Sequence, residues 1–428
     1  MNTQSQTLKE TRPQETPAHN IKCRFCRTPL SQTFVDLGMS PLCESYVKAE
    51  DLNKMEAFYP LNALVCDSCY LVQLDEYVSA ADIFTEYAYF SSYADSWVEH
   101  SRIYTEQMIS RFNLGAQGQV VELASNDGYL LQHFVKRGVP SLGIEPAANV
   151  AKVAVEKGVP TEVVFFGEKS AKDLLARGKA ADLLLGNNVL AQVPDINDFV
   201  LGMKILLKPT GVITMEFPHL QRLMEGNQFD TIYHEHFSYF SFIAAEKIFN
   251  AHGLKLFDVE ELSTHGGSIR IYACHAERTD QPVLPRAIEL KAREEKLGFT
   301  RMDTYALFDE QVKETKRKLL EFLIGARRAG KTIAGYGAPG KGNTLLNYCG
   351  IRTDFIEYTV DRNPYKQGKF LPGTRIPIYA PERIRLTKPD YLFILPWNFK
   401  DEIVAQNAYI REWGGQFVVP IPEVTVLP

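Results

Sequence analysis

The pattern of apolar and polar positions divides the chain into segments with different predicted secondary structure. From residue 119 to about 280, short apolar runs alternate with segments of helical periodicity. In "QVVELASNDGYLLQHF", for example, a strand, a polar turn and a helix follow one another. This alternation predicts βαβ units around a parallel sheet. Residues 284–330 are charge-rich and helical in pattern, and a second alternating α/β unit begins at "KTIAGYG".

Composition narrows the class of protein. The chain has 428 residues, 45% of them hydrophobic and 23% charged, with a formal net charge of -5. The chain lacks the net positive charge that favours binding to nucleic acid or to an anionic membrane, so we expect neither as a partner. No apolar run approaches the roughly 18 to 20 residues that span a bilayer. The first 20 residues are polar and lack the apolar core of a signal peptide, which predicts a disordered lead and a cytoplasmic protein. We expect the protein to be a monomer or a weak dimer.

Four of the seven cysteines form two CxxC pairs, "CRFC" and "CDSC". Two such pairs place four thiolates on two turns, which is how structural zinc is held tetrahedrally. A disulfide framework is not expected in a long chain without a secretory signal, and four sulfur ligands leave no open position for chemistry. The predicted zinc ligands are Cys23, Cys26, Cys66 and Cys69. The other three cysteines are interpreted as buried thiols.

The central segment carries a nucleotide-type fingerprint without the full G-x-G-x-x-G spacing. A strand ends at Glu122, a loose turn follows, and Glu145 ends the next strand, where an acid can accept hydrogen bonds from ribose hydroxyls. Such a turn suits S-adenosylmethionine (SAM), which has no phosphate. A third strand ends on two asparagines at the carboxyl edge of the sheet. The predicted cofactor residues are Glu122, Ala124, Asn126, Gly128, Glu145, Asn187 and Asn188.

A second fingerprint lies in the C-terminal segment. Gly335, Gly337 and Gly340 have G-x-G-x-x-G spacing, and Asp361 ends a strand about twenty residues later. This pattern favours a nucleotide-diphosphate or dinucleotide cradle, although Pro339 is uncommon in such turns. Lys341 is placed to reach a phosphate, or else it is a solvated lysine. Two candidate substrate ligands follow, Lys341 and, after a glycine pair, Arg270, whose alternative is a surface arginine.

The segment "TIYHEHFSYFS", residues 231–241, concentrates two imidazoles, a carboxylate and two phenols. It is interpreted as proton-abstraction machinery. The alternative is a metal site, since His234 and His236 would share a face of a strand, but a third ligand is not evident. His234 is as readily structural as catalytic, and Tyr239 is interpreted as a packing residue.

Together these motifs resemble the sugar C-methyltransferases that act on nucleotide-linked keto-deoxysugars. The motifs are the paired CxxC, "VELASNDGYLLQHF", "YHEHFSYFS" and "GYGAPGKGNTLLNY", and the resemblance covers nearly the whole chain. It implies an α/β chain with a small N-terminal zinc-binding module, a central Rossmann-type SAM methyltransferase domain and a C-terminal Rossmann-like domain that helps bind the nucleotide-sugar. The expected segments are 1–20 (lead), 21–77 (zinc module), 78–283 (methyltransferase), 284–330 (helical connector) and 331–428 (C-terminal domain).

The resemblance also implies an active site, which maps onto Tyr87, Tyr233, Glu235 and His236. Methyl transfer to carbon beside a ketone needs a base to remove the α-proton and donors for the enolate oxygen. His236 is the expected base, Glu235 orients it or shares its role, and the tyrosines serve the oxyanion. The family histidine that faces the substrate is replaced by Gln192, which can hydrogen-bond but cannot carry a proton.

The expected function is a SAM-dependent C-methyltransferase acting on a nucleotide-linked keto-deoxysugar, dTDP-linked or similar, in branched-chain sugar biosynthesis. The alternative is an NAD-dependent nucleotide-sugar oxidoreductase or epimerase that uses the C-terminal glycine turn. A third possibility is a binding role for the zinc module in an assembly without catalysis. The expected cofactors are SAM and structural zinc.

Overall fold

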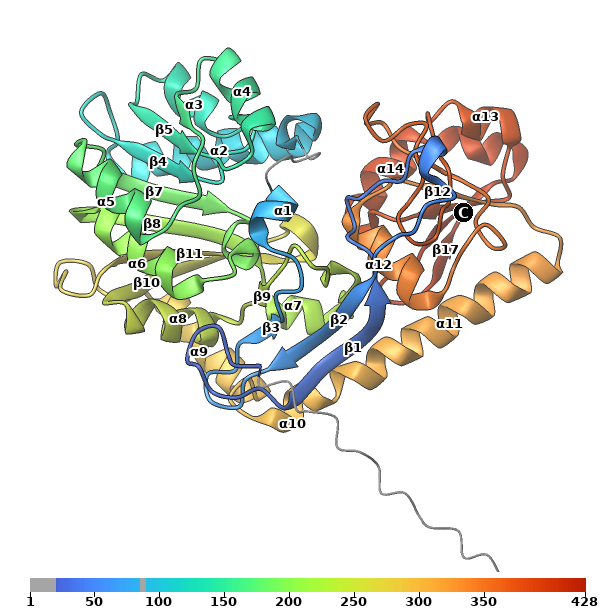
Figure 1. Ribbon diagram of the computed structural model, residues 1–428, viewed down its shortest axis with the longest axis horizontal. Coiled ribbons are helices and arrows are strands. Elements are labelled where there is room, and N and C mark those ends of the chain that lie inside the picture. The colour runs from blue at the N-terminus through green and yellow to red at the C-terminus, as the bar shows by residue number, and fades with distance from the viewer. Residues whose placement is uncertain (1–20, 85–89) are drawn as a thin grey trace, which may run out of the picture.

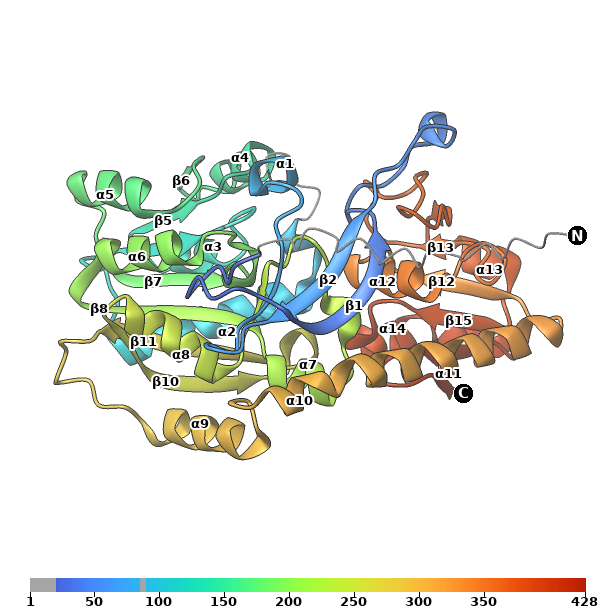
Figure 2. The ribbon, with the colours of Figure 1, turned by 60° about the horizontal axis from the view of Figure 1, so that its bottom comes forward.

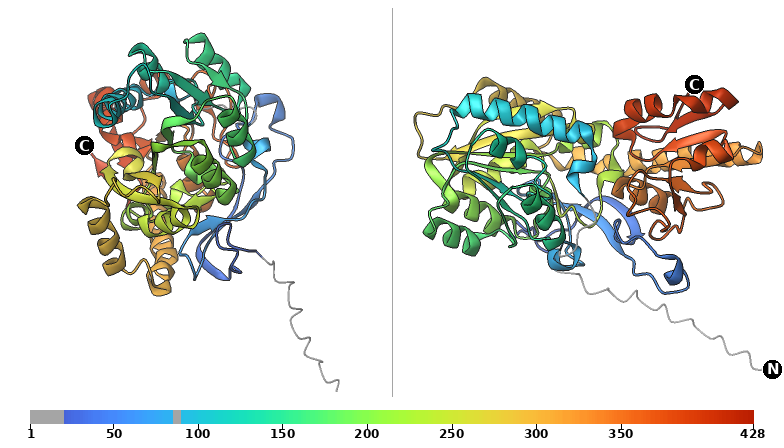
Figure 3. Two further views of the ribbon diagram at one scale, coloured as in Figure 1. Left: turned by 90° about the vertical axis from the view of Figure 1, so that its left-hand side faces the viewer. Right: turned by 90° about the horizontal axis from the view of Figure 1, so that it is seen from above.

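The computed structural model describes residues 21–84 and 90–428 and contains three sheets. The two larger α/β units lie side by side along the long axis of the molecule (Figures 1 and 3). The smaller N-terminal sheet lies between them, low in the view of Figure 1. Within the described ranges, no helix is both long enough and apolar enough to cross a membrane.

The small sheet is antiparallel and four-stranded, in the order β1-β2-β3-β9. Its strands are β1 (Gln32–Ser40), β2 (Tyr59–Val65), β3 (Val72–Leu74) and β9 (Ser238–Tyr239). A short helix, α1 (Ala80–Phe84), follows. The last strand comes from the central segment, directly after the "YHEHF" motif. The zinc module is therefore joined to the candidate active site by a strand pairing that the sequence pattern did not show.

The central sheet has seven strands in the order β10-β11-β8-β7-β4-β5-β6. The strands are β4 (Val120–Leu123), β5 (Ser141–Ile144), β6 (Thr161–Glu162), β7 (Ala181–Asn187), β8 (Leu207–Pro218), β10 (Leu254–Leu262) and β11 (Ser268–His275). The strands from β8 to β6 pair in parallel, and β10 and β11 add an antiparallel edge. The helices of this unit are α2 (Asp95–Phe112), α3 (Leu131–Lys136), α4 (Ala148–Glu156), α5 (Glu168–Ala176), α6 (Ile196–Leu206), α7 (Leu220–Glu225) and α8 (Phe242–Ala251). This order places the carboxyl ends of β4, β5 and β7 next to one another, where open α/β sheets bind ligands.

The C-terminal sheet has six strands in the order β14-β13-β12-β15-β16-β17, all parallel except the last pair. Its strands are β12 (Ile333–Tyr336), β13 (Thr359–Val360), β14 (Ile378–Tyr379), β15 (Tyr391–Ile394), β16 (Gln416–Val419) and β17 (Thr425–Leu427). Its helices are α12 (Gly340–Cys349), α13 (Arg383–Thr387) and α14 (Lys400–Gln406). The chain is thus α/β in two Rossmann-like units, as the sequence predicted.

The predicted helical connector consists of α9 (Pro285–Leu297), α10 (Met302–Ala306) and the long α11 (Phe308–Arg328). Helix α11 buries one stripe of side chains at three- and four-residue spacing, which is the pattern of an amphipathic helix. These are Phe308, Val312, Thr315, Leu319, Leu323 and Ala326. The ring of Phe308 stacks on Phe34 of β1 at 4.6 Å. Figure 2 shows α11 running beneath β1 toward the C-terminal unit, so one hydrophobic core joins the small sheet to that unit.

Candidate active site and cofactor pocket

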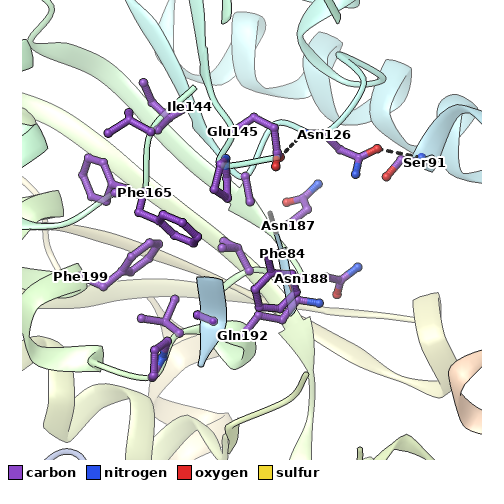
Figure 4. A pocket seen from close by; sticks show the side chains of 18 of the residues that line it. Phe84, Ser91, Asn126, Ile144, Glu145, Phe165, Asn187, Asn188, Gln192 and Phe199 are labelled. Carbon is purple, nitrogen blue, oxygen red and sulfur yellow. Dashed lines mark hydrogen bonds between the residues drawn. The ribbon is translucent and has the colours of Figure 1, made fainter. Parts of the chain in front are cut away.

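A cavity of about 290 Å³ lies at the carboxyl ends of β4, β5 and β7 (Figure 4). The turn after β4 reaches it through Ala124 and Asn126, which both have positive φ, at 55° and 49°. Such a backbone is rare for residues other than glycine, and its strain is typical of ligand-binding turns. The lining includes five of the predicted cofactor residues, Ala124, Asn126, Glu145, Asn187 and Asn188.

Glu145 is the acidic group of this cavity. Its Oε2 accepts a hydrogen bond from the backbone N–H of Asn126 at 2.9 Å, and Oε1 accepts one from Ala147 at 2.8 Å. Burial raises the pKa of the Glu145 carboxyl, and the two N–H donors oppose that rise. The side chain of Asn126 in turn accepts from the N–H of Ser91, as Figure 4 shows. The carboxylate is held by backbone donors and keeps lone pairs for a diol.

Two of the predicted cofactor residues support the turn without lining the cavity. Glu122 is fully buried on β4, and burial raises the pKa of its carboxyl. Gly128 has φ +76°, and a Cβ there would lie 3.1 Å from Ala154 and Val159. Glycine therefore allows the turn to approach α4 closely, and we assign both residues to shaping the turn.

We expect Glu145→Ala to weaken SAM binding by about 1.5 to 3 kcal/mol, because a hydrogen-bonded charged acceptor is lost. The measurement is the dissociation constant of S-adenosylhomocysteine by calorimetry. Glu162→Ala is the matched control, since this glutamate lies at the end of the neighbouring strand β6 and pairs with Arg177 instead. An unchanged dissociation constant for Glu145→Ala would move the acidic contact elsewhere.

A second cavity of about 410 Å³ lies between the central and C-terminal units. It shares Asn188 and Gln192 with the first cavity, so the two meet at these side chains. Its lining brings together Tyr233, Glu235 and His236 from the motif after α7 and Lys341 from α12. Of the predicted catalytic residues, Tyr87 lies outside the described residues.

His236 has the geometry of a general base. Its Nδ1 donates to the backbone carbonyl of Thr231 at 3.0 Å, which leaves Nε2 unprotonated when the ring is neutral. Burial, with a further contribution from the charge of Lys341, lowers the pKa of His236 to about 4. The ring of Tyr233 lies 4.1 Å from that of His236. The Thr231 carbonyl fixes the orientation of the His236 ring, and the sequence could not show this partner because a backbone atom leaves no sequence signal.

Glu235 meets a residue from the N-terminal module. The Cys43 thiol lies 3.3 Å from Glu235 Oε1, with the thiol as donor. Nearly 200 positions separate these residues in the sequence, so no local pattern could pair them. The loop after β1 therefore reaches the candidate catalytic motif.

His234 and Tyr239 serve structure. His234 Nε2 donates to the carbonyl of Pro60 at 3.1 Å, and its ring lies edge-on to Tyr59. The Tyr239 hydroxyl accepts from the N–H of Tyr233 at 3.3 Å. His234 and His236 thus face different partners, because the motif is a turn and only its end is strand. The metal alternative for this segment is not supported.

Lys341 projects from the first turn of α12 into the second cavity. Its Nζ lies 3.4 Å from the carbonyl oxygen of His265 and 4.7 Å from the centre of the Trp397 ring. Burial lowers the pKa of Lys341 to about 8. A cationic side chain at a helix N-terminus forms an anion site when the helix dipole and free N–H groups add to it.

Arg270 does not line either cavity and leaves the proposed substrate set. Its side chain is 2% exposed, and its guanidinium donates to Glu216 at 2.7 Å and to Glu260 at 3.1 Å. Arg270 forms internal ion pairs, because β11 lies between β8 and β10 in the sheet and each of these strands carries an acidic partner. The sequence showed the arginine and not its partners.

The polar backbone groups of the C-terminal glycine turn are hydrogen-bonded to other residues of this chain. Asp361 Oδ2 accepts a hydrogen bond from the N–H of Ala338 at 2.7 Å, which ties the end of β13 to the glycine turn. The carbonyl of Ala338 accepts from Tyr46 at 2.7 Å and from Lys366 at 2.8 Å. These contacts do not support the NAD-dependent alternative.

The four predicted zinc ligands converge. Their sulfur atoms all lie within 4.8 Å of one another, with Cys23–Cys69 and Cys26–Cys66 at 3.5 Å. Tetrahedral coordination at a Zn–S distance of about 2.3 Å requires sulfur atoms roughly 3.8 Å apart, so the cluster fits zinc. Among the described residues this is the group of metal-ligating side chains that the structure assembles.

Known protein families and one curated relative match the chain over most of its length. Three family models match successive parts of the chain: "Putative zinc binding domain" over 23–84, "Methyltransferase domain" over 99–259 and "C-methyltransferase C-terminal domain" over 263–422. The C-methyltransferase NovU of Streptomyces niveus is 37% identical over 406 residues, which cover 95% of this chain and 96% of NovU.

Solved structures share only part of the chain. Magnesium protoporphyrin IX methyltransferase from Synechocystis PCC 6803, with bound SAM, is 14% identical, covers 42% of this chain and 82% of its own, and has a TM-score of 0.33. A SAM-dependent methyltransferase from Clostridium acetobutylicum ATCC 824 is 12% identical, covers 42% and 92%, and has a TM-score of 0.34. At these scores neither structure bears on the site.

Proposed function

This chain belongs to the SAM-dependent C-methyltransferases with an N-terminal zinc-binding domain, and on that premise we propose that it methylates a carbon beside the ketone of a nucleotide-linked keto-deoxysugar. One observation carries the proposal. The cavity lined by His236 and Lys341 and the proposed cofactor cavity share two lining side chains, Asn188 and Gln192. A base, an anion site and the methyl donor's cavity therefore meet around one space.

The cofactor's place follows from the first cavity. Glu145 is suited to the ribose hydroxyls, and Asn126, Asn187 and Asn188 supply polar contacts around the rest. When bound there, SAM supplies an electrophilic methyl group. The same cavity also has an apolar side, which includes Phe165 and Phe199.

The second cavity performs the proton chemistry. His236 removes the α-proton through Nε2, while Thr231 holds Nδ1–H and stabilises the charged ring that results. Tyr233, whose ring lies 4.1 Å from that of His236 and is tilted by 34°, would donate to the enolate oxygen. The resulting enolate carbon would be the acceptor for the methyl group that bound SAM supplies, with S-adenosylhomocysteine as the leaving product. Glu235 and Gln192 line the same space and complete the polar contacts to the sugar.

Lys341 and the N-terminus of α12 are proposed to receive the diphosphate. The substrate's sugar then lies toward His236 and its nucleoside toward the C-terminal unit, where Arg362, Asn363 and Phe399 line the cavity. The two phosphates would neutralise a half-buried lysine that has no carboxylate within ion-pairing distance among the described residues.

The test is transfer of a labelled methyl group from SAM to a panel of nucleotide-linked keto-deoxysugars. We expect label on a ring carbon, and S-adenosylhomocysteine but not NAD should raise the melting temperature. At a ligand concentration a hundred times its dissociation constant, the stabilisation is about 2.7 kcal/mol. Stabilisation by NAD without S-adenosylhomocysteine binding would overturn the proposal.

A further inference from the structure

The loop that follows β1, residues 41–46, is anchored at both ends of the substrate cavity. Near its start, the Cys43 thiol donates to Glu235 of the catalytic motif at 3.3 Å. At its end, the Tyr46 hydroxyl donates to the Ala338 carbonyl in the glycine turn at 2.7 Å. Backbone hydrogen bonds between Val47 and Phe370, at 2.8 and 3.0 Å, extend the second anchor. The loop therefore bridges the catalytic motif and the C-terminal unit, and Glu44 is the residue of this loop that lines the cavity.

Glu44 lies between the two anchors and lines the cavity. Its side chain is 18% exposed, and its Oε2 has no hydrogen-bond partner among the described residues. A buried carboxylate oxygen without a donor costs about 1 to 3 kcal/mol, so this oxygen requires a donor from a ligand or from water.

Burial raises the pKa of Glu44, and Lys366 and the Tyr46 hydroxyl, whose proton is donated to the Ala338 carbonyl, oppose that rise. Lys366 Nζ lies 3.8 Å from Oε2, close enough for an ion pair and too far for a hydrogen bond. That ammonium donates instead to the Ala338 carbonyl at 2.8 Å and lies over the Tyr46 ring. Both side chains are thereby fixed, and Oε2 remains available to a donor inside the cavity.

The position of Glu44 favours the sugar as the source of that donor. Glu44 follows directly on Cys43, which touches Glu235, and its charge acts on the phenol of Tyr233. Both of these residues belong to the catalytic end of the cavity. The diphosphate, being an acceptor of hydrogen bonds, is not a partner for a carboxylate.

We propose that Glu44 is a specificity-determining residue that accepts a hydrogen bond from a hydroxyl or amino group of the sugar ring. This inference rests on the proposed nucleotide-sugar substrate. It gives the zinc-binding part of the chain a direct role in substrate choice, because the loop that carries Glu44 is held by the small sheet.

The experiment measures calorimetric binding of UDP, UDP-glucose and UDP-glucosamine, with the thymidine series in parallel, to the full chain saturated with S-adenosylhomocysteine. The wild-type protein is expected to bind the sugar conjugates more tightly than the diphosphate. Glu44→Ala is expected to weaken conjugate binding about tenfold to a hundredfold and to change diphosphate binding less than twofold. Glu50→Gln, an exposed acid of the same module, is the control and should bind every ligand as the wild type does.

Glu44→Gln separates the two sources of the donor. Glutamine retains an acceptor oxygen without the charge, so a hydroxyl partner leaves UDP-glucose binding nearly intact. An ammonium partner makes UDP-glucosamine the ligand that loses most. Two results with Glu44→Ala would overturn the role of Glu44. One is that the affinity for the diphosphate falls as much as the affinity for the sugar conjugates. The other is that the affinity for neither conjugate falls. If the wild type binds S-adenosylhomocysteine but none of the nucleotides, the proposed substrate fails and the inference with it.

Discussion

His236→Asn is expected to lower turnover at least a hundredfold while SAM binding stays near normal. General-base catalysis contributes roughly a hundred- to ten-thousandfold, and asparagine keeps a polar side chain without the ability to take the proton. Proton exchange at the α-carbon in heavy water, measured without methyl donor, should slow in parallel. This second measurement isolates the step assigned to Nε2.

His234→Asn is the matched control for this variant. It makes the same chemical change two positions away, in a side chain bound to the Pro60 carbonyl outside the cavity. It should retain turnover within a few fold. Full exchange and turnover in His236→Asn would transfer the role of base to Glu235 or to a group outside this segment. Gln192→His is a companion variant, and only a modest change in rate is expected if Gln192 simply hydrogen-bonds the substrate.

The pH dependence follows from the same residue. The base acts only when neutral, and burial holds the pKa of His236 at about 4, so kcat/KM should fall only as the pH drops through that value. Lys341 also lowers the pKa of His236. A bound diphosphate would offset that positive charge, so the acidic limb of kcat should lie at higher pH than that of kcat/KM.

Loss of the zinc site is expected to have the other large effect. Cys26→Ser removes one of four thiolates, and structural zinc contributes apparent binding energies of about 10 to 16 kcal/mol in small zinc-finger peptides. We expect zinc content to fall and the small sheet to unfold at lower temperature, while the central unit still binds S-adenosylhomocysteine. Substrate binding should weaken as well, because the loop from Cys43 to Tyr46 depends on that sheet.

Metal analysis and calorimetry check this expectation directly. The wild-type chain, purified without chelator, should contain one zinc ion. Cys274→Ser serves as the control, since it also places a hydroxyl at a buried thiol but lies on β11, away from the cluster. A wild-type protein without zinc, or a Cys26→Ser variant with full zinc content and unchanged unfolding, would contradict the assignment.

Features that depend on neighbours in the chain could be predicted from the sequence alone. The two CxxC pairs were sufficient to indicate four converging sulfurs, because each pair is held in one tight turn. The position of Glu145 at the end of its strand followed from the alternation of apolar runs and helices. Parallel strands order their carboxyl ends along one edge, so this acid and the turn after Glu122 had to lie close together.

Only the tertiary structure decided which buried polar groups meet. Periodicity reports that a side chain is buried but not what lies opposite it, so it could neither pair Arg270 with Glu216 nor separate His234 from His236. The Thr231 carbonyl that orients the base and the thiol at Glu235 come from contacts without a local signature. Glu44 was equally hidden, because long-range packing of the small sheet against α11 carries its loop into the cavity. Charge and hydrogen-bond partners across sheets are set by the fold, and the chemistry of this site depends on them.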